Sequence, residues 1–168
     1  MGILTDDMKR VIEEQRLGFV VTVCDDGTPN LSPKGTMVVL DDDNIMFGEI
    51  RSPNTITNIR ANPATEINFI DPMARTGYRF RGQARIIEGG SNEFETLLPR
   101  FDGWGELAGT INAIIALRVE RALPLSSPAY DMGATEADLR KTWMGPTSRP
   151  CSRTIKRADR GPDNHLIG

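Results

Sequence analysis

Apolar residues recur along this chain with two periods, one typical of helices and one typical of strands. Near the start, Leu4, Met8, Val11 and Ile12 share one face of a helix that is expected to end at Gly18, and Thr5 stands where a capping residue is favoured. Elsewhere, β-branched content and alternation predict six strands, at Phe19–Asp25, Asn30–Leu40, Ile45–Glu49, Thr65–Ile70, Gly77–Glu88 and Ile111–Ala122. The alanines of the last segment would also suit a helix. Capping residues and helix breakers predict three further helices, from Pro53 to about Asn62, from Ser91 to about Phe101, and at Thr135–Met144.

Short polar turns connect several of these strands. Asp26-Gly27 is a strong hairpin signal, and the acidic run Asp41–Asn44 makes a second turn. Antiparallel strands joined in this way, with helices at the corners, predict a mainly β fold: a small, closed or partly closed barrel with peripheral helices. At 168 residues and without an internal repeat, the chain is expected to form one domain over residues 1–144.

The last part of the chain differs from this domain in charge. Residues 1–144 carry 15 Lys and Arg against 21 Asp and Glu, whereas residues 145–168 carry five against two. A basic tail can bind nucleic acid, but this one is short and contains no aromatic residue. Because Pro146–Gly168 also has no apolar periodicity, we expect a solvated, poorly ordered tail and no nucleic-acid partner.

The chain is poor in the residues that metal sites and nucleophilic catalysts need. It has two scattered cysteines, Cys24 and Cys151, and one histidine, His165. A zinc site takes several Cys and His ligands, and a catalytic triad needs a placed histidine. We therefore expect no metal site, and an enzyme of this composition would take its chemistry from an organic cofactor.

Hydropathy and the first residues bear on location. No apolar run approaches the roughly 20 residues of a membrane span. The first 15 residues are acidic and predicted helical, unlike a secretory signal peptide with its basic start and apolar centre. These features predict a cytoplasmic protein without a membrane partner.

The helix that begins at Ser52-Pro53 is a candidate phosphate site. Proline is favoured at the first helical position, and serine before it is favoured as a cap. Free N–H groups at a helix N-terminus attract anions, Ser52 and Thr55 add hydroxyl groups, and Arg51 adds a positive charge. The alternative is a capped surface helix with Arg51 in solvent, since every helix needs its ends satisfied.

The strand before it places polar residues on one face. Ser32, Lys34 and Thr36 alternate with Pro33 and Gly35, which mark a bulge or an edge. This polar face either lies in water or binds a ligand. Together with the helix N-terminus, which one hairpin brings close, it predicts a site for an elongated phosphorylated ligand.

Three other residues leave alternatives open. Arg79 and Arg81 share the polar face of the fifth strand, where they either pair with acidic residues or line a pocket. Trp104 lies in the run Asp102-Gly103-Trp104-Gly105, which predicts a loop. A loop tryptophan can stack on a planar ring, bury into a partner subunit or pack in the core.

Three segments resemble the pyridoxamine 5′-phosphate oxidase-like superfamily of FMN-binding split β-barrels. They read GFVVTVCDDGTPNLSPKGT, IMFGEIRSPNTITNIRANP and YRFRGQARII, and the similarity extends over about residues 5–144. The resemblance implies a six-stranded antiparallel Greek-key split barrel and a homodimer with two FMN sites at the subunit interface. It also implies an oxidoreductase that passes hydride between the flavin and a small-molecule substrate.

The resemblance assigns residues to the cofactor by position. One group, Ser32, Pro33, Lys34, Gly35 and Thr36, would lie along the flavin. A second group, Arg51, Ser52, Thr55 and Asn58, would hold the phosphate end, and Trp104 is added as a candidate for ring stacking. No residue is an evident general acid or base, so none is predicted to be catalytic.

The chain departs from the true oxidases in two places. Those enzymes have an Arg-Lys pair where this chain has Asn54-Thr55, and their basic, histidine-containing substrate motif has no counterpart in Pro146–Gly168. Oxidation of vitamin B6 is therefore not expected. The alternative function is a binding or storage module on the same barrel that holds flavin, haem or deazaflavin without turnover, and a purely structural dimer is a third possibility.

Overall fold

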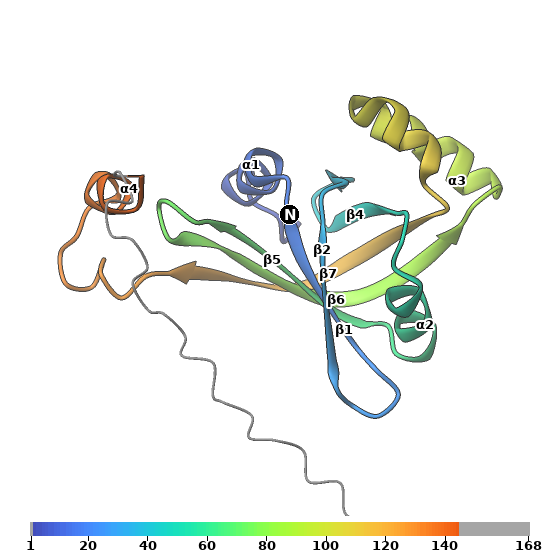
Figure 1. Cartoon of the computed structure of the whole chain (residues 1–168), viewed down its shortest axis with the longest axis horizontal. Coiled ribbons are helices and arrows are strands. Elements are labelled where there is room, and N and C mark those ends of the chain that lie inside the picture. The colour runs from blue at the N-terminus through green and yellow to red at the C-terminus, as the bar shows by residue number, and fades with distance from the viewer. Residues whose placement is uncertain (1, 145–168) are drawn as a thin grey trace, which may run out of the picture.

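A computed structural model describes residues 2–144, and the predicted basic tail lies outside this range. Figure 1 shows a strongly curved sheet with helices at its ends and along one side. In chain order the elements are α1 (Asp6–Gln15), β1 (Gly18–Val23), β2 (Pro29–Lys34), β3 (Met37–Val39), β4 (Asn44–Glu49), α2 (Pro53–Ala61), β5 (Ala64–Asp71), β6 (Thr76–Glu88), α3 (Asn92–Leu97), the 3-10 helix η1 (Leu98–Thr110), β7 (Ala113–Ser126) and α4 (Glu136–Met144). None of these helices is long and apolar enough to span a membrane.

One antiparallel sheet of seven strands carries the fold, in the order β2-β1-β5-β6-β7-β4-β3. The strands β2 and β3 follow each other in the chain but lie at opposite edges of the sheet. Such an arrangement requires the sheet to curl until its two edges approach each other. The predicted mainly β split barrel with peripheral helices is therefore confirmed.

The strand count differs from the prediction by one, because the predicted strand Asn30–Leu40 is two strands. β2 pairs with β1 from Pro29 to Lys34, and β3 pairs with β4 from Met37 to Val39. Between them, the Gly48 N–H donates to the Thr36 carbonyl at 3.2 Å. Gly35 and Thr36 thus form the seam where the two edges of the curled sheet meet.

The core lies in two clusters on opposite faces of the sheet, because successive residues of β4 and β7 alternate between them. The larger lies between α1 and the sheet and includes the fully buried Phe47, Phe69 and Phe80, the last two packed edge to face with centroids 6.1 Å apart. The smaller lies under α3 and η1 around Phe101. Burying rings of this size is the main source of stability in a domain without described disulfides.

The first helix begins as predicted and ends differently. The Thr5 hydroxyl accepts from the Met8 N–H at 3.3 Å, which is the expected cap. The C-terminal turn is made by Arg16 in the left-handed region (φ 55°), not by Gly18. Gly18 instead begins β1, where a Cβ would lie 2.5 Å from a Met37 methyl carbon.

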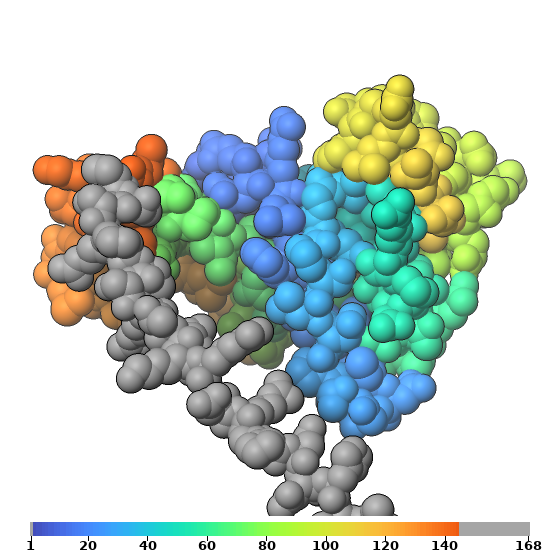
Figure 2. Space-filling view, viewed as in Figure 1, coloured from blue at the N-terminus to red at the C-terminus, as the bar shows by residue number. Residues whose placement is uncertain are grey.

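The region after Ser91 also differs from the prediction. The α-helix ends at Leu97, and the chain continues to Thr110 as a 3-10 helix that includes Trp104, which was predicted to lie in a loop. Gly105 interrupts this segment with φ 57° and ψ −129°, a conformation that glycine adopts easily because it has no Cβ. In Figure 2 the segment from β2 to β4, in light blue and cyan, lies between α1 and η1, so η1 flanks the seam.

Candidate functional site

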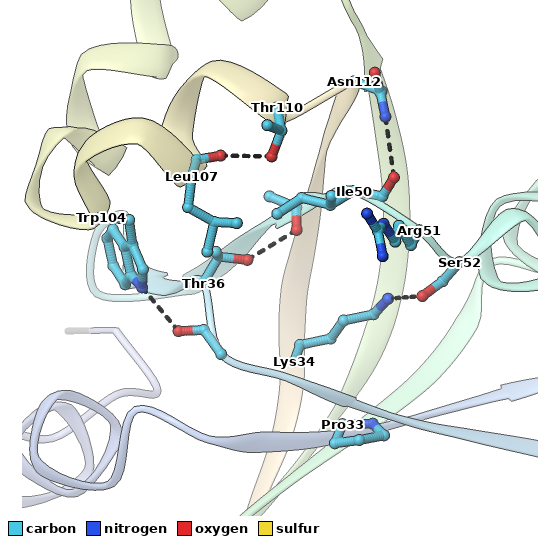
Figure 3. Close-up of a pocket in the computed structure, with 12 residues that line it drawn as sticks. Pro33, Lys34, Thr36, Ile50, Arg51, Ser52, Trp104, Leu107, Thr110 and Asn112 are labelled. Carbon is cyan, nitrogen blue, oxygen red and sulfur yellow. Dashed lines mark hydrogen bonds between the residues drawn. The ribbon is translucent and has the colours of Figure 1, made fainter.

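A cavity of about 820 Å³ opens at the seam of the barrel (Figure 3). Its walls come from the β2–β3 connection, the end of β4 and η1. The volume falls within the range of about 300–1,000 Å³ that small-molecule sites occupy. Seven predicted site residues line it: Pro33, Lys34, Gly35, Thr36, Arg51, Ser52 and Trp104.

Lys34 is the buried cation of this cavity. Its ammonium donates to Glu49 Oε2 at 2.8 Å and also donates to the Ser52 hydroxyl. Both members of the ion pair are buried, and Lys34 Nζ lies 5.7 Å from the centroid of the Phe47 ring. The interpretation of Lys34 as a solvent-exposed residue of a polar strand face is therefore wrong.

Glu49 was missed by sequence reasoning. Its Oε1 accepts from the Ser52 backbone N–H while Oε2 accepts from Lys34, so one carboxylate joins β2, β4 and the start of α2. A charged residue at the end of the apolar segment Ile45–Glu49 was the available signal, because Glu is rarely buried unless it is paired.

The start of α2 borders a second, smaller cavity of about 210 Å³. Arg51 and Ser52 line both cavities, and Ser32 and Thr55 line the smaller one. Thr55 is fully buried, and its hydroxyl has no hydrogen-bond partner among residues 2–144. A buried hydroxyl without a partner costs free energy, which a ligand acceptor at this point would recover.

Ser52 is placed as predicted but bonded differently. Pro53 occupies the first helical position, yet the Ser52 side chain makes no capping hydrogen bond to α2. Its hydroxyl lies 3.4 Å from the Ser32 hydroxyl and accepts from Lys34 instead. Arg51 is exposed and takes part in no ion pair within the described chain, so it leaves a positive charge at the junction of the two cavities.

Thr36 and Trp104 support the seam. The Thr36 hydroxyl donates to the Gly48 carbonyl at 2.8 Å, and the Trp104 indole N–H donates to the Gly35 carbonyl at 3.0 Å (Figure 3). Trp104 also packs against Phe101, with ring centroids 5.8 Å apart. A Cβ on Gly35 would meet no atom within 4 Å, so this glycine leaves open space at the cavity wall.

One predicted site residue, Asn58, lines neither of the two cavities. Asn58 is buried and donates to the Thr22 hydroxyl of β1 at 3.0 Å. This bond anchors α2 to the sheet, so in this structure Asn58 supports the site without lining it.

The two arginines of β6 pair with an acidic residue, which was one of the two interpretations. Arg81 donates to Glu66, and Arg79 Nε lies 2.9 Å from Glu66 Oε1, although its N–H is not directed at an acceptor. Burial acts to raise the pKa of Glu66, but hydrogen bonds from Arg81 and Asn68 and the nearby positive charges outweigh it and lower the pKa. These residues lie outside both cavities, but Arg81 and Glu66 also line a separate pocket of about 370 Å³, so the other interpretation holds as well for Arg81.

Comparison with known proteins identifies the family. The sequence matches the pyridoxamine 5′-phosphate oxidase family over residues 4–117, which span the seam and both cavities. The chain belongs to the pyridoxamine 5′-phosphate oxidase family. Within the family's fold, HupZ from Group A Streptococcus is 34% identical, with 74% of this chain and 95% of that chain covered and a TM-score of 0.63. No curated protein sequence gives a match.

More distant structures share the fold of this family. An FMN-binding protein from Syntrophomonas wolfei is 14% identical, with 71% of this chain and 84% of that chain covered and a TM-score of 0.62. The haem storage protein HutZ from Vibrio cholerae is 17% identical, with coverages of 73% and 94% and a TM-score of 0.60. The two proteins differ in what they hold, so the fold by itself does not decide the ligand.

Proposed function

We propose that this protein binds FMN, with the ring in the larger cavity and the phosphate at the start of α2. The observation that carries the proposal is the pair of adjoining cavities, which share Arg51 and Ser52 as a common wall. The larger has the volume of a small-molecule site, and the smaller is lined by Thr55, whose buried hydroxyl has no partner within the described chain. A long ligand with an anionic end fits this division.

The donor groups present suit such a ligand. The start of α2 offers backbone N–H groups and the positive end of the helix dipole, which favour a phosphate. Thr55 and Ser52 add hydroxyl groups and Arg51 adds charge, in place of the Arg-Lys pair of the true oxidases. The open space at Gly35 lets a flat ring approach the backbone, and Lys34 faces the same cavity.

We further propose that the protein is an oxidoreductase that acts on a small molecule. Bound FMN would supply hydride transfer, and the chain would supply binding, orientation and charge. Lys34, held by Glu49, would place a positive charge beside the ring, where negative charge develops on reduction. Trp104 and Leu107 would exclude water from one wall of the cavity.

A binding module without turnover is the second candidate. No His, Cys, Asp, Glu or Tyr lines the larger cavity within the described chain, so an evident general acid or base is lacking there. The same observation is compatible with hydride transfer, which a flavin performs with few protein groups. Turnover therefore has to be tested separately from binding.

A homodimer with sites at the subunit interface belongs to the same proposal. Exposed apolar side chains stand at the rims of both cavities: Leu31 is 60% exposed at the smaller and Leu107 is 46% exposed at the larger. A second copy of the chain that covers these side chains would also close the cavities. Light scattering of the purified protein, with and without FMN, tests for this dimer.

A cytoplasmic location is a further part of the proposal, tested by cell fractionation.

An absorbance spectrum and a titration test the cofactor. We expect the purified full-length protein to quench the fluorescence of added FMN at one site per chain. We also expect a reduced nicotinamide donor to reduce the bound flavin, and an added electron acceptor to oxidise it again. Haem and the deazaflavin F420 are titrated in parallel. Saturable binding of haem or F420 with no uptake of FMN would overturn the proposal, whereas FMN binding without turnover with any donor and acceptor would leave the binding module.

A further inference from the structure

The hydroxyl of Ser52 does not do what a serine at this position usually does. A cap residue accepts a hydrogen bond from the N–H of the second or third helical residue. Here the Ser52 side chain makes no such bond, and the Thr55 N–H donates to the Ser52 backbone carbonyl at 3.0 Å. The Asn54 N–H, at the second helical position, is thus without its side-chain cap.

Lys34 explains where the hydroxyl has turned. An ammonium group can only donate, so the contact between Lys34 and Ser52 Oγ makes the hydroxyl an acceptor toward Lys34. The single O–H of Ser52 is then directed away from Lys34 and is free to donate. Within the described chain it has the Ser32 hydroxyl as a partner at 3.4 Å, which is long for a hydrogen bond between two hydroxyls.

Glu49 fixes this arrangement from behind. One carboxylate oxygen accepts from Lys34 at 2.8 Å, and the other accepts from the backbone N–H of Ser52. The carboxylate therefore holds both members of the Lys34–Ser52 contact. Glu49 itself is buried and is not among the residues that line the larger cavity, so it acts through its two neighbours.

We propose that Glu49 is a positioning residue which, through Lys34, turns the Ser52 hydroxyl from a helix cap into a donor for the anionic end of the ligand. The buried Thr55 hydroxyl, unpartnered among residues 2–144, is the independent sign that an acceptor belongs at this helix start. The identity of the ligand rests on the proposed function. The geometry requires only that its end group accepts hydrogen bonds.

The direction in which Glu49→Gln changes anion affinity distinguishes a positioning role from a purely electrostatic one. If Glu49 acted only through its negative charge, Glu49→Gln would make the site more positive and would tighten anion binding. If Glu49 positions Lys34 and Ser52, the same substitution loosens both and weakens the contacts to the anionic group.

The experiment measures the dissociation constants of FMN and of riboflavin, which lacks the phosphate, at fixed ionic strength. We expect the preference for FMN to fall about tenfold in Glu49→Gln, which is the loss of roughly one charge-assisted hydrogen bond. Ser52→Ala should lose the same preference, whereas Ser52→Thr should retain it. Glu93→Gln is the matched control, because Glu93 pairs with the exposed Arg85 and lines neither cavity.

The double variant tests whether the two residues act through one hydroxyl. Glu49→Gln with Ser52→Ala should show no further loss beyond either single change. An unchanged or increased preference for FMN in Glu49→Gln, or additive losses in the double variant, would overturn the role of Glu49. Should Glu49→Gln fail to fold, retention of the full preference by Ser52→Ala would overturn it equally.

Inorganic phosphate separates this proposal from the identity of the cofactor. If the wild-type protein binds neither flavin, the proposed function is wrong. The positioning role of Glu49 is then tested by thermal unfolding in the presence of inorganic phosphate. Phosphate should then raise the unfolding midpoint of the wild type and of Glu93→Gln, and should not raise that of Glu49→Gln or Ser52→Ala. An equal rise of the unfolding midpoint in all four proteins would overturn the positioning role of Glu49.

Discussion

Replacing Thr55 by valine should raise the stability of the protein without ligand and should weaken its binding of FMN. The Thr55 hydroxyl is fully buried and has no hydrogen-bond partner within the described chain. An unsatisfied buried polar group costs about 1–3 kcal/mol, and valine has nearly the same shape without the hydroxyl. We therefore expect the free energy of unfolding to rise by about 1–3 kcal/mol.

Binding should change in the opposite direction. If the hydroxyl donates to the phosphate of FMN, its loss removes one hydrogen bond to a charged group, worth about 1.5–3 kcal/mol, or roughly 10- to 150-fold in the dissociation constant. Urea unfolding without ligand measures the first effect, and a fluorescence titration with FMN measures the second.

The matched control is Thr65→Val. The Thr65 hydroxyl is also buried but donates to the Pro63 carbonyl at 3.1 Å, and Thr65 lies outside both cavities. This variant should lose stability and keep its affinity for FMN. A Thr55→Val protein that is less stable than wild type, or that binds FMN as tightly, would refute the reasoning.

Three further predictions concern the site and its support. Lys34→Met leaves the Glu49 carboxylate buried without its cation and should lower the free energy of unfolding by about 3–5 kcal/mol, measured in urea. Lys9→Met removes the more exposed pair with Asp42 and should lower it far less. Similar losses for both variants would contradict the burial argument. Trp104→Phe removes the bond to the Gly35 carbonyl and should cost about 0.5–1.5 kcal/mol by the same measurement, and no loss would show that the bond does not hold η1 to the seam. Hydrogen bonds from Tyr78, the larger cause, and from Arg10 lower the pKa of Asp7 below 3.8, so the stability of wild type relative to Asp7→Asn should be fully present above about pH 3.8 and disappear as the pH falls through the lowered pKa. A stability difference that persists under acid conditions would show that the Asp7 carboxylate is not its source.

Local sequence signals were sufficient for most elements because each acts within a few residues. Thr5 caps α1, Asp26-Gly27 turns β1 into β2, and the alternation of Gly77–Glu88 matches a single long strand. The ambiguous segment rich in alanine is strand β7, because it pairs with β6 and with β4 and the two core clusters bury both faces of residues 113–117. Neighbouring strands decided this outcome, and local propensity could not.

The candidate site divides in the same way. Residue types near Lys34 and Ser52 indicated an anionic, elongated ligand, and seven of the ten predicted residues do line one cavity. The sequence did not indicate that Lys34 is buried or that Asn58 faces β1. Nor did it show that the predicted strand Asn30–Leu40 would break at Gly35 and send its halves to opposite edges of the sheet.

By itself, then, the sequence determined most of the strands, the turns, the start of the first helix and the family, because short-range propensities and motifs are written in consecutive residues. The tertiary structure alone decided that Lys34 meets Glu49, fifteen positions away, and that Trp104 reaches the Gly35 carbonyl, sixty-nine positions away. The physical reason is the curl of the sheet, which removes a polar strand face from water. Once buried, its lysine requires a carboxylate, and that requirement places the charges of the candidate site.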